Sequence, residues 1–192
     1  MTLGLLLLVA ALLLTGYNIY ESKRAEIISE AAVKEICSEL EQKEKRDELN
    51  RPDYQLFPDK EMPAIEIDGE LYIGVLEFPD LNMTLPVMAG EWSYAKLKKS
   101  PCRYDGSVYQ NNMVIAGHNY RSHFSKIKNL QLGSEVRFID TDGNIFVYNI
   151  GWIDILQETD VAAMLEPGDW DLTLFTCTYG GEERYTLRCL KK

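Results

Sequence analysis

The sequence predicts a small all-β domain that follows an apolar N-terminal helix. About seven or eight short segments rich in β-branched and aromatic residues recur after residue 70, separated by turn signals. A Thr-Asp-Gly sequence at residues 141–143 is a strong hairpin signal between two of these segments. Residues 1–20 carry no charged side chain and are rich in leucine. We therefore expect an antiparallel barrel or sandwich with short helices, attached to an N-terminal membrane and stalk helix.

The first segment, residues 1–20, is expected to be an uncleaved transmembrane anchor. The aliphatic run at residues 3–14 is shorter than the roughly 20 residues that a bilayer requires. It becomes long enough when residues 15–20 are included, where Tyr17 and Tyr20 fit the interface. A cleaved signal peptide is the alternative, but no basic residue precedes the run and no small-residue cleavage site follows it. Lys23 and Arg24 weakly favour a cytoplasmic location for the downstream side.

The second segment, residues 21–51, is rich in Glu, Lys and Ala and has no Gly or Pro. Val33, Ile36 and Leu40 recur at helical spacing, as do Ile28 and Ala32. Because opposite charges alternate along the rest, we expect a solvated helical stalk. A coiled coil is the alternative, but its apolar seam is short. Pro52 ends the helix, residues 52–69 are expected to be a linker, and residues 70–192 form the folded domain.

The domain is expected to contain strands joined by short turns and single helical turns. A turn is predicted at residues 104–106, and helical turns at residues 92–99, 121–127 and 161–165. Strands are predicted at residues 70–78, 83–87, 113–116, 135–140, 144–155, 172–177 and 184–188.

Charge and cysteine content exclude several classes of function. The formal net charge is −10, so the chain has no general attraction for phosphate backbones and we expect no nucleic-acid partner. The chain has two histidines and no Cys-x-x-Cys pair, so we expect no metal site. Glu158, Asp160 and Glu166 are interpreted as solvated acids and not as calcium ligands. We expect four free thiols, at Cys37, Cys102, Cys177 and Cys189.

A candidate nucleophile lies at the end of the strand at residues 172–177. Cys177 is its last residue, and Arg184 and Arg188 alternate onto one face of the next strand. A thiol beside a fixed cation is a candidate nucleophile, although a buried packing cysteine is an equal alternative. His118 follows the strand at residues 113–116, so the imidazole meets the thiol if these two strands are neighbours. His123 lies in a polar segment and is expected to be solvent-exposed.

Three motifs in this sequence resemble the sortases, which are membrane-anchored cysteine transpeptidases. TLFTC at residues 173–177 resembles the family's TLxTC signature, AGHN at residues 116–119 its histidine motif, and YIGVLEFP at residues 72–79 its first core strand. The order of His118, Cys177 and arginine is also the order in the family. The GHN triplet resembles class B, but the loop before TLFTC is too short for the helix inserted in that class, so the class stays open.

The resemblance implies an eight-stranded β-barrel with the site in a groove on its wall. It implies that Cys177 is the nucleophile, His118 the acid and base, and Arg184 the arginine near the oxyanion. Arg188 is the alternative arginine, on the same face but about 13 Å further along the strand. Thr176 is either part of the substrate or oxyanion pocket or an ordinary strand threonine.

The resemblance also implies a substrate, a partner and a location. The helical turn at residues 161–165 contacts the apolar residue of the sorting peptide, which makes Val161 and Leu165 candidate substrate-binding residues. The implied reaction cleaves a C-terminal sorting motif after threonine through a thioacyl-enzyme. The acyl group then passes to an amine of a peptidoglycan precursor or a pilin, outside a single-pass membrane anchor, without a cofactor. A thiol protease and a non-enzymatic surface module are the alternatives.

Overall fold

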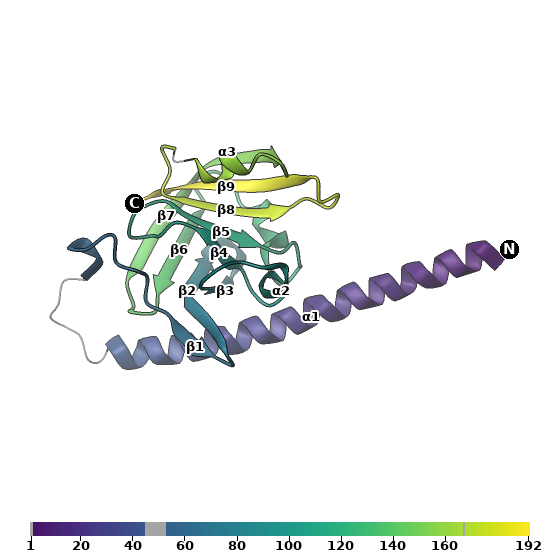
Figure 1. Cartoon of the computed structure of the whole chain (residues 1–192), viewed down its shortest axis with the longest axis horizontal. Helices are drawn as coiled ribbons and strands as arrows, with labels where there is room; N and C mark the ends of the chain where they lie inside the picture. The colour runs from purple at the N-terminus through teal and green to yellow at the C-terminus, as the bar shows by residue number, and fades with distance from the viewer. Residues whose placement is uncertain (1, 45–52, 167) are drawn as a thin grey trace.

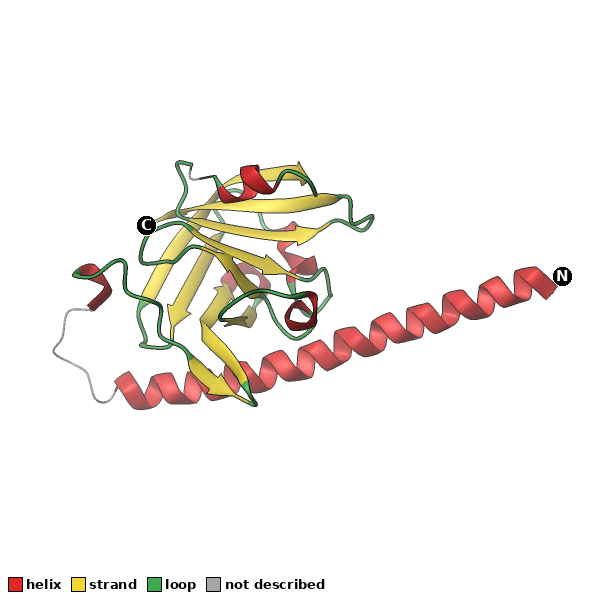
Figure 2. Ribbon diagram, viewed as in Figure 1, coloured by secondary structure: helices red, strands yellow, loops and turns green. Residues whose placement is uncertain are grey.

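The computed structural model describes residues 2–44, 53–166 and 168–192 (Figure 1). In this part of the chain eight strands form a closed barrel, in the order β2-β3-β4-β5-β8-β9-β7-β6, and the pairing of β6 with β2 closes it (Figure 2). A further short strand, β1, pairs with the start of β2. The predicted eight-stranded barrel is confirmed. The strands are β1 (Ile65–Ile67), β2 (Glu70–Phe78), β3 (Met83–Met88), β4 (Cys102–Asp105), β5 (Met113–Gly117), β6 (Glu135–Asp140), β7 (Ile145–Gln157), β8 (Leu172–Cys177) and β9 (Glu183–Lys191).

Closure of the barrel depends on the glycine inside β2. Gly74 pairs with Asp140 of β6 and also with Val87 of β3, so both neighbouring strands approach its backbone. Its φ is +151°, and a Cβ atom there would collide with the carbonyl oxygen of Ile139. A glycine is therefore required at this position of the strand.

Two strand pairings differ from the antiparallel arrangement that we expected. β3 pairs with β4 in parallel, and β5 pairs with β8 in parallel. Parallel neighbours need a long connection. The β3–β4 connection contains α2 (Tyr94–Leu97), and the β5–β8 connection contains β6, β7 and α3 (Val161–Leu165). Because β5 and β8 run in the same direction, their carboxyl ends lie at one rim of the barrel.

Alternating side chains of the strands fill the barrel with apolar groups. Leu76, Phe138, Tyr148, Leu174 and Leu187 lie in this core and are fully buried. Most predicted elements occur close to their expected positions. The exceptions are β4, which includes part of the turn expected at residues 104–106, and β1, which lies in the linker expected at residues 52–69. Short 3₁₀ helices complete the fold: η1 (Asp53–Gln55), η2 (Pro79–Leu81) and η3 (Phe124–Asn129).

The long helix α1 (Thr2–Glu44) does not behave as the solvated stalk that we expected. Its first half projects from the domain, whereas its second half runs along the outside of the barrel beside β1, β2 and β3 (Figure 1). Ala25, Ser29, Ala32 and Ile36 recur at helical spacing and are buried. Small side chains at these positions let the helix backbone approach the barrel. The expected end of the helix near residue 51 lies outside the described residues.

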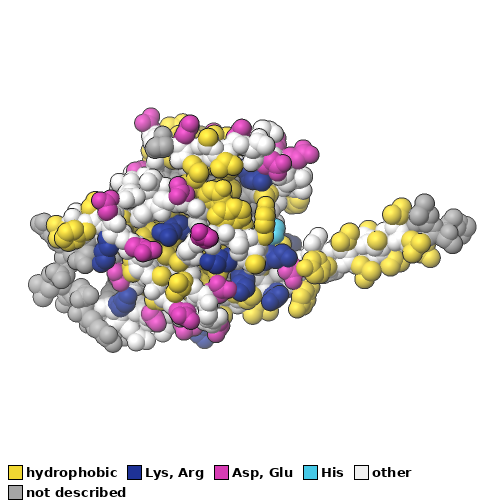
Figure 3. Space-filling view, viewed as in Figure 1, with side chains coloured by type: hydrophobic (Ala, Val, Ile, Leu, Met, Phe, Trp, Pro, Cys, Tyr) yellow, Lys and Arg dark blue, Asp and Glu magenta, His cyan; other side chains and the backbone are white. Residues whose placement is uncertain are grey.

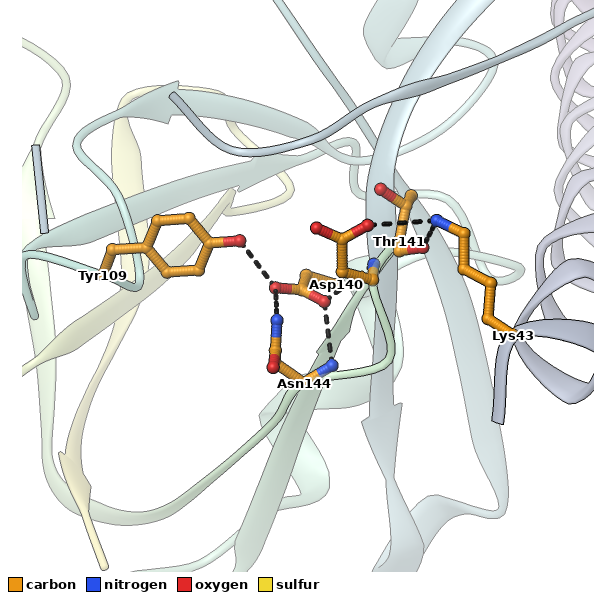
Figure 4. Close-up of polar contacts among 6 residues, drawn as sticks. Lys43, Tyr109, Asp140, Thr141 and Asn144 are labelled. Atoms are coloured by element: carbon orange, nitrogen blue, oxygen red, sulfur yellow. Dashed lines mark hydrogen bonds and ion pairs between the residues drawn. The ribbon is translucent and has the colours of Figure 1, made fainter. Parts of the chain in front are cut away.

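The C-terminal end of α1 is fastened to the β6–β7 hairpin. Lys43 Nζ donates to the carbonyl oxygen of Thr141 (2.6 Å) and to the Asp142 carboxylate (3.0 Å). The hairpin is itself rigid, because the buried Asp140 carboxylate accepts hydrogen bonds from Tyr109 Oη (2.7 Å) and Asn144 Nδ2 (2.8 Å) (Figure 4). The C-terminal end of the packed half of α1 is therefore held against the barrel.

The projecting half of α1 is apolar and exposed. Leu5, Leu8, Leu12 and Ile19 have more than half of their surface accessible. Among the described residues, α1 is the one helix long and apolar enough to cross a membrane. This half is therefore compatible with a membrane anchor.

Candidate active site

The register of β5 and β8 brings two sequence-distant motifs together. Gly117, the last residue of β5, pairs with Thr176 of β8. The next residue on each strand is His118 and Cys177, and neighbouring strands lie about 4.8 Å apart. The strand pairing therefore brings the backbones of His118 and Cys177 side by side, and the contact of imidazole with thiol stays a prediction. Gly117 is required here, because a Cβ atom would collide with the ring of Phe124.

The thiol of Cys177 is free and partly exposed. Cys102 and Cys189 are also free, but both are buried, and burial raises the pKa of Cys102 to about 12. Burial also raises the pKa of the Cys189 thiol. These two cysteines are therefore packing residues, as predicted, whereas Cys177 lies where a substrate can reach it.

His118 is half-buried, and its ring is oriented by its neighbours. Nδ1 accepts a hydrogen bond from the backbone N–H of Asn119 (2.9 Å), and the ring stacks on Tyr120 with centroids 3.9 Å apart. Burial lowers the pKa of His118 below its usual range, and the nearby Lys98 ammonium lowers it further. The ring is therefore neutral near pH 7. With Nδ1 engaged as an acceptor, the proton of the neutral ring lies on Nε2.

Arg184 lies directly opposite Cys177 in the antiparallel pairing of β8 and β9. Directly paired residues project from the same face of a sheet. Arg184 Nη1 donates to the carbonyl oxygens of Gly181 (2.7 Å) and Glu183 (3.2 Å), and Nη2 lies 3.7 Å from the Glu158 carboxylate. These contacts fix the Arg184 guanidinium at the start of β9, on the strand next to Cys177. The sequence did not identify Glu158 as a partner of Arg184. Glu158 lies in the connection between β7 and β8, and its position relative to β9 follows only from the fold.

Arg188, the alternative arginine, lies opposite Thr173, four residues before Cys177 on β8. Only 2% of its side chain is exposed, and its guanidinium stacks on Trp170 at 4.4 Å from the ring centroid. Its contacts fasten α3 to the barrel wall and leave it directed away from the thiol. Its partners are Thr173 Oγ1 (3.0 Å), the carbonyl oxygens of Met164 (3.3 Å) and Ala163 (2.5 Å), and the Asp154 carboxylate (3.3 Å).

An apolar patch on the outer face of the barrel continues from Cys177. Phe175 shares the face of Cys177 because side chains alternate along a strand. It packs with Val114, Ala116 and Met164, and Tyr104 lies edge-on to its ring at 5.3 Å. Phe175 and these three neighbours are all less than a tenth exposed, so the thiol stands at one end of a buried apolar cluster that lies on the outside of the barrel.

The three predicted substrate-binding residues differ in exposure. Val161 and Leu165 on α3 are 40% and 37% exposed, and Leu165 lines a hollow of about 200 Å³ that also contains Val114 and Trp170. Thr176 is 1% exposed, and its hydroxyl has no hydrogen-bond partner within the described residues. Since it alternates with Cys177, its side chain points into the barrel. A direct contact of Thr176 with a peptide is therefore not available in this structure.

His123 is buried, and the expectation that it would be solvent-exposed is wrong. Its Nε2 lies 3.1 Å from Ser29 Oγ of α1, and Ser29 Oγ also donates to the carbonyl oxygen of Lys99. The prediction failed because the helix that covers His123 was interpreted as a free stalk. Burial lowers the pKa of His123 to about 4.

In the parts of the chain that the structure describes, no three His, Cys, Asp or Glu side chains are placed to hold a metal ion together. The arrangement offers instead a thiol, an imidazole and a guanidinium on adjoining strands. These groups are suited to acyl transfer through a covalent thioester.

Comparisons with known proteins agree with this arrangement. A family model described as the Sortase domain matches residues 76–191. The fold is similar to that of a sortase D5 transpeptidase from Clostridium perfringens, with 20% identity and a TM-score of 0.63 over 86% of this chain and 98% of that one. A comparison with curated proteins found no match.

Two sortase C structures are also similar. Sortase C of Streptococcus pneumoniae has 20% identity and a TM-score of 0.62, over 84% of this chain and 96% of that one. Sortase C of Clostridium perfringens, solved with the C-terminal cell wall sorting motif, has 19% identity and a TM-score of 0.56, over 93% and 98%.

Proposed function

The chain belongs to the sortase family of cysteine transpeptidases, and we propose that it cleaves a C-terminal sorting motif after threonine and transfers the acyl group to an amine. The acceptor amine belongs to a peptidoglycan precursor or a pilin. The observation that supports the proposal most strongly is the strand register: Gly117 and Thr176, which directly precede His118 and Cys177, are paired, and Arg184 is paired with Cys177. His118, Cys177 and Arg184 all belong to strand ends or to residues that directly follow them.

The first step is attack on the threonine carbonyl. The thiolate of Cys177 adds to the carbonyl carbon, and negative charge develops on the carbonyl oxygen. The Arg184 guanidinium is already fixed by the carbonyl oxygens of Gly181 and Glu183, so it needs little reorganisation to face that charge. Removing one oxyanion donor typically costs about 3 kcal/mol of transition-state stabilisation.

The second step is proton transfer to the leaving amine. The imidazolium form of His118 supplies this proton as the carbon–nitrogen bond breaks, which leaves a neutral imidazole and a thioester on Cys177. An incoming amine then attacks the thioester and returns a proton to His118. The pKa of His118 is lowered by burial and by Lys98, so the imidazolium is scarce near pH 7. We therefore expect modest turnover.

The peptide is proposed to lie over the outer face of β8, next to the thiol. Phe175 and Ala116 are buried beneath this face and support it from below. Val161 and Leu165 of α3 stand at its side and receive the apolar residue of the motif. Thr176 acts from beneath this face, by holding β8 in place.

The chain is proposed to be anchored by the first half of α1, with the catalytic domain outside the cell. The exposed apolar surface of α1 supports the anchor. The extracellular location follows from the proposed reaction, because the acceptor amines lie at the cell surface.

The test uses a panel of sorting-motif peptides and the full chain in detergent. We expect one peptide to be cleaved after threonine, and added amine to shift the product from acid to amide. Cys177→Ala must abolish both reactions. Cys37→Ala, which removes the other partly exposed thiol, is the matched control and must retain them.

Two results would contradict the proposal. Product that stays an acid at every amine concentration would identify a thiol protease. A Cys177 that reacts with a thiol probe equally with and without His118→Ala, and cleaves no peptide, would identify an inert surface module.

A further inference from the structure

We propose that the end of the domain from which α1 projects is a docking surface for a membrane that contains anionic phospholipids. The inference goes beyond the proposed transpeptidation and rests on the proposed anchoring of α1. The surface is named the basic collar and consists of five exposed basic residues: Lys23, Arg24, Lys98, Arg121 and Lys126.

The collar residues come from three separate segments that meet around the first buried turn of α1. Glu21 is largely buried there and lies 3.9 Å from Arg24 and 4.0 Å from Lys98 of the segment after α2. The hydroxyls of Ser22 and Ser122 are 3.4 Å apart, and Ser122 Oγ donates to the carbonyl oxygen of Ser22. These contacts bring the loop after β5, with Arg121, against the helix.

The two remaining collar positions lie on the same side of the helix. Lys23 Nζ donates to the Glu26 carboxylate (2.8 Å), and its ammonium is close enough to Arg121 for their charges to repel. Lys126 of η3 interacts electrostatically with Glu26. Figure 3 shows Lys and Arg side chains gathered where the helix leaves the domain, with a histidine beside them.

The net charge of the basic collar is positive, whereas the net charge of the whole chain is negative. The formal net charge is −10, yet the collar joins five basic side chains to three acidic ones, Glu21, Glu26 and Glu30. Glu21 is enclosed between Arg24 and Lys98, and Glu26 is paired with Lys23. Such a local excess of positive charge attracts anionic headgroups and repels a cationic partner.

The collar lies at the depth where a bilayer surface would be. The exposed apolar part of α1 ends at Tyr20, and the collar begins three residues later at Lys23. At 1.5 Å per residue this separation is about 5 Å, which is less than the Debye length of about 8 Å at physiological salt. Tyr17 and Tyr20 are both exposed and fit the interface between hydrocarbon and headgroups.

The packing of α1 fixes which end of the domain faces the membrane. The helix is continuous from Thr2 to Glu44 and is fastened by Ser29 near its middle and Lys43 at its end. The domain therefore does not turn freely on its anchor. The carboxyl ends of β5 and β8 point toward the side from which α1 projects (Figures 1 and 2). Docking of the collar thus places the catalytic rim next to the membrane surface.

The test follows amide hydrogen exchange of residues 119–126 in the full chain reconstituted into vesicles. Vesicles of phosphatidylcholine alone are compared with vesicles that also contain phosphatidylglycerol. We expect several-fold slower exchange in the anionic vesicles, and loss of the difference at high salt. Lys98→Glu/Arg121→Glu/Lys126→Glu must exchange at the rate seen in neutral vesicles. Lys191→Glu/Lys192→Glu at the C-terminus, on the other end of the domain (Figure 1), is the control and must behave as the unchanged chain.

Further variants and conditions distinguish membrane docking from other causes of slower hydrogen exchange. Arg121→Gln/Lys126→Gln, which removes charge without reversing it, must lose part of the difference even if the triple variant misfolds. The same protection from inorganic phosphate with neutral vesicles would overturn the proposal in favour of a soluble anion. Equal exchange in both vesicle types would also overturn it. The difference must persist in Cys177→Ala, so failure of the catalytic proposal is observed separately.

Discussion

Arg184 and Arg188 lie on one face of β9, and the structure assigns them different roles that two substitutions separate. Arg188→Met removes a buried guanidinium and retains most of the apolar side chain. Arg184→Ala removes the guanidinium that lies opposite the thiol. We expect the first change to lower stability and peptide binding, and the second to lower the rate of the chemical step.

The loss of stability in Arg188→Met is worked from its contacts. Three acceptors lose a buried donor: Thr173 Oγ1 and the carbonyl oxygens of Ala163 and Met164. Each lost hydrogen bond costs about 1 kcal/mol, so we expect the free energy of unfolding to fall by about 3 kcal/mol. The Asp154 side chain is 41% exposed and regains water, so it adds little. For a chain of this size, 3 kcal/mol lowers Tm by roughly 10 °C.

The kinetic effects of the two substitutions are expected to differ in kind. Without Arg188, α3 loses its attachment and Val161 and Leu165 lose their fixed position, so KM rises while kcat at saturation changes little. Arg184→Ala is expected to lower kcat by about 10²- to 10³-fold, as removal of an oxyanion donor does. Its effect on Tm is small because its acceptors, the carbonyl oxygens of Gly181 and Glu183, belong to residues that are only partly buried.

Thermal unfolding and steady-state cleavage of the identified peptide, both in detergent, measure these effects. The reasoning is refuted if Arg188→Met leaves Tm unchanged and lowers kcat a hundredfold while Arg184→Ala keeps kcat. That result would make Arg188 the oxyanion arginine. Arg188→Lys is the matched control for charge, and it is expected to restore stability only in part because an ammonium cannot reach all the acceptors.

Three further predictions concern titration and the hairpin. The fall of kcat/KM on the acid side is expected below pH 6.5, because the pKa of His118 is lowered. Lys98→Ala should shift this fall to higher pH. An unchanged pH profile would contradict the role assigned to Lys98. The pKa of His123 is about 4 in the folded protein and about 6.5 in the unfolded chain. As the pH falls, the unfolded chain therefore binds the proton first. The free energy of unfolding should fall by about 1.4 kcal/mol per pH unit from pH 6.5 toward pH 4. Unfolding curves across this range should be flatter for His123→Asn than for the unchanged chain. Asp140→Ala is expected to lower the free energy of unfolding by about 3 kcal/mol by leaving Tyr109 Oη and Asn144 Nδ2 without their acceptor, and an unchanged Tm would show that water replaces the carboxylate.

The strands of the barrel were predicted well where the segment itself has an alternating or continuous apolar pattern. Segments 70–78, 135–140 and 172–177 alternate or run apolar over at least six residues and became β2, β6 and β8 at those bounds. The turn at residues 141–143 was visible because Gly143 supplies the positive φ that the hairpin needs. The four-residue β4 was not predicted, because pairing with β5 across the sheet, and not its own composition, defines it.

Long-range packing of small residues was invisible in the sequence. Ala25, Ser29 and Ala32 bury little apolar area, and the short apolar seam that includes Ala32 and Ile36 was interpreted as part of a solvated helix. Small side chains are nevertheless what allows the helix to lie close to β2 and β3. The burial of His123 followed from the same packing, because its partner Ser29 is 94 residues away.

The height of the catalytic rim above the membrane depends on whether α1 is packed against the barrel or is a free stalk. On a free stalk, Cys177 would sample many heights above the membrane, and substrates with long or short spacers before their own apolar segment would be served alike. Because Ser29 and Lys43 hold α1 against the barrel, the height of the rim is set by the fold. An extended peptide advances about 3.3 Å per residue, so each residue added between the sorting motif and the membrane moves the scissile bond by that amount relative to a fixed thiol. Cleavage should therefore have an optimum spacer length in vesicles, and that optimum should broaden in Ser29→Glu, which places an unpaired carboxylate in the helix interface.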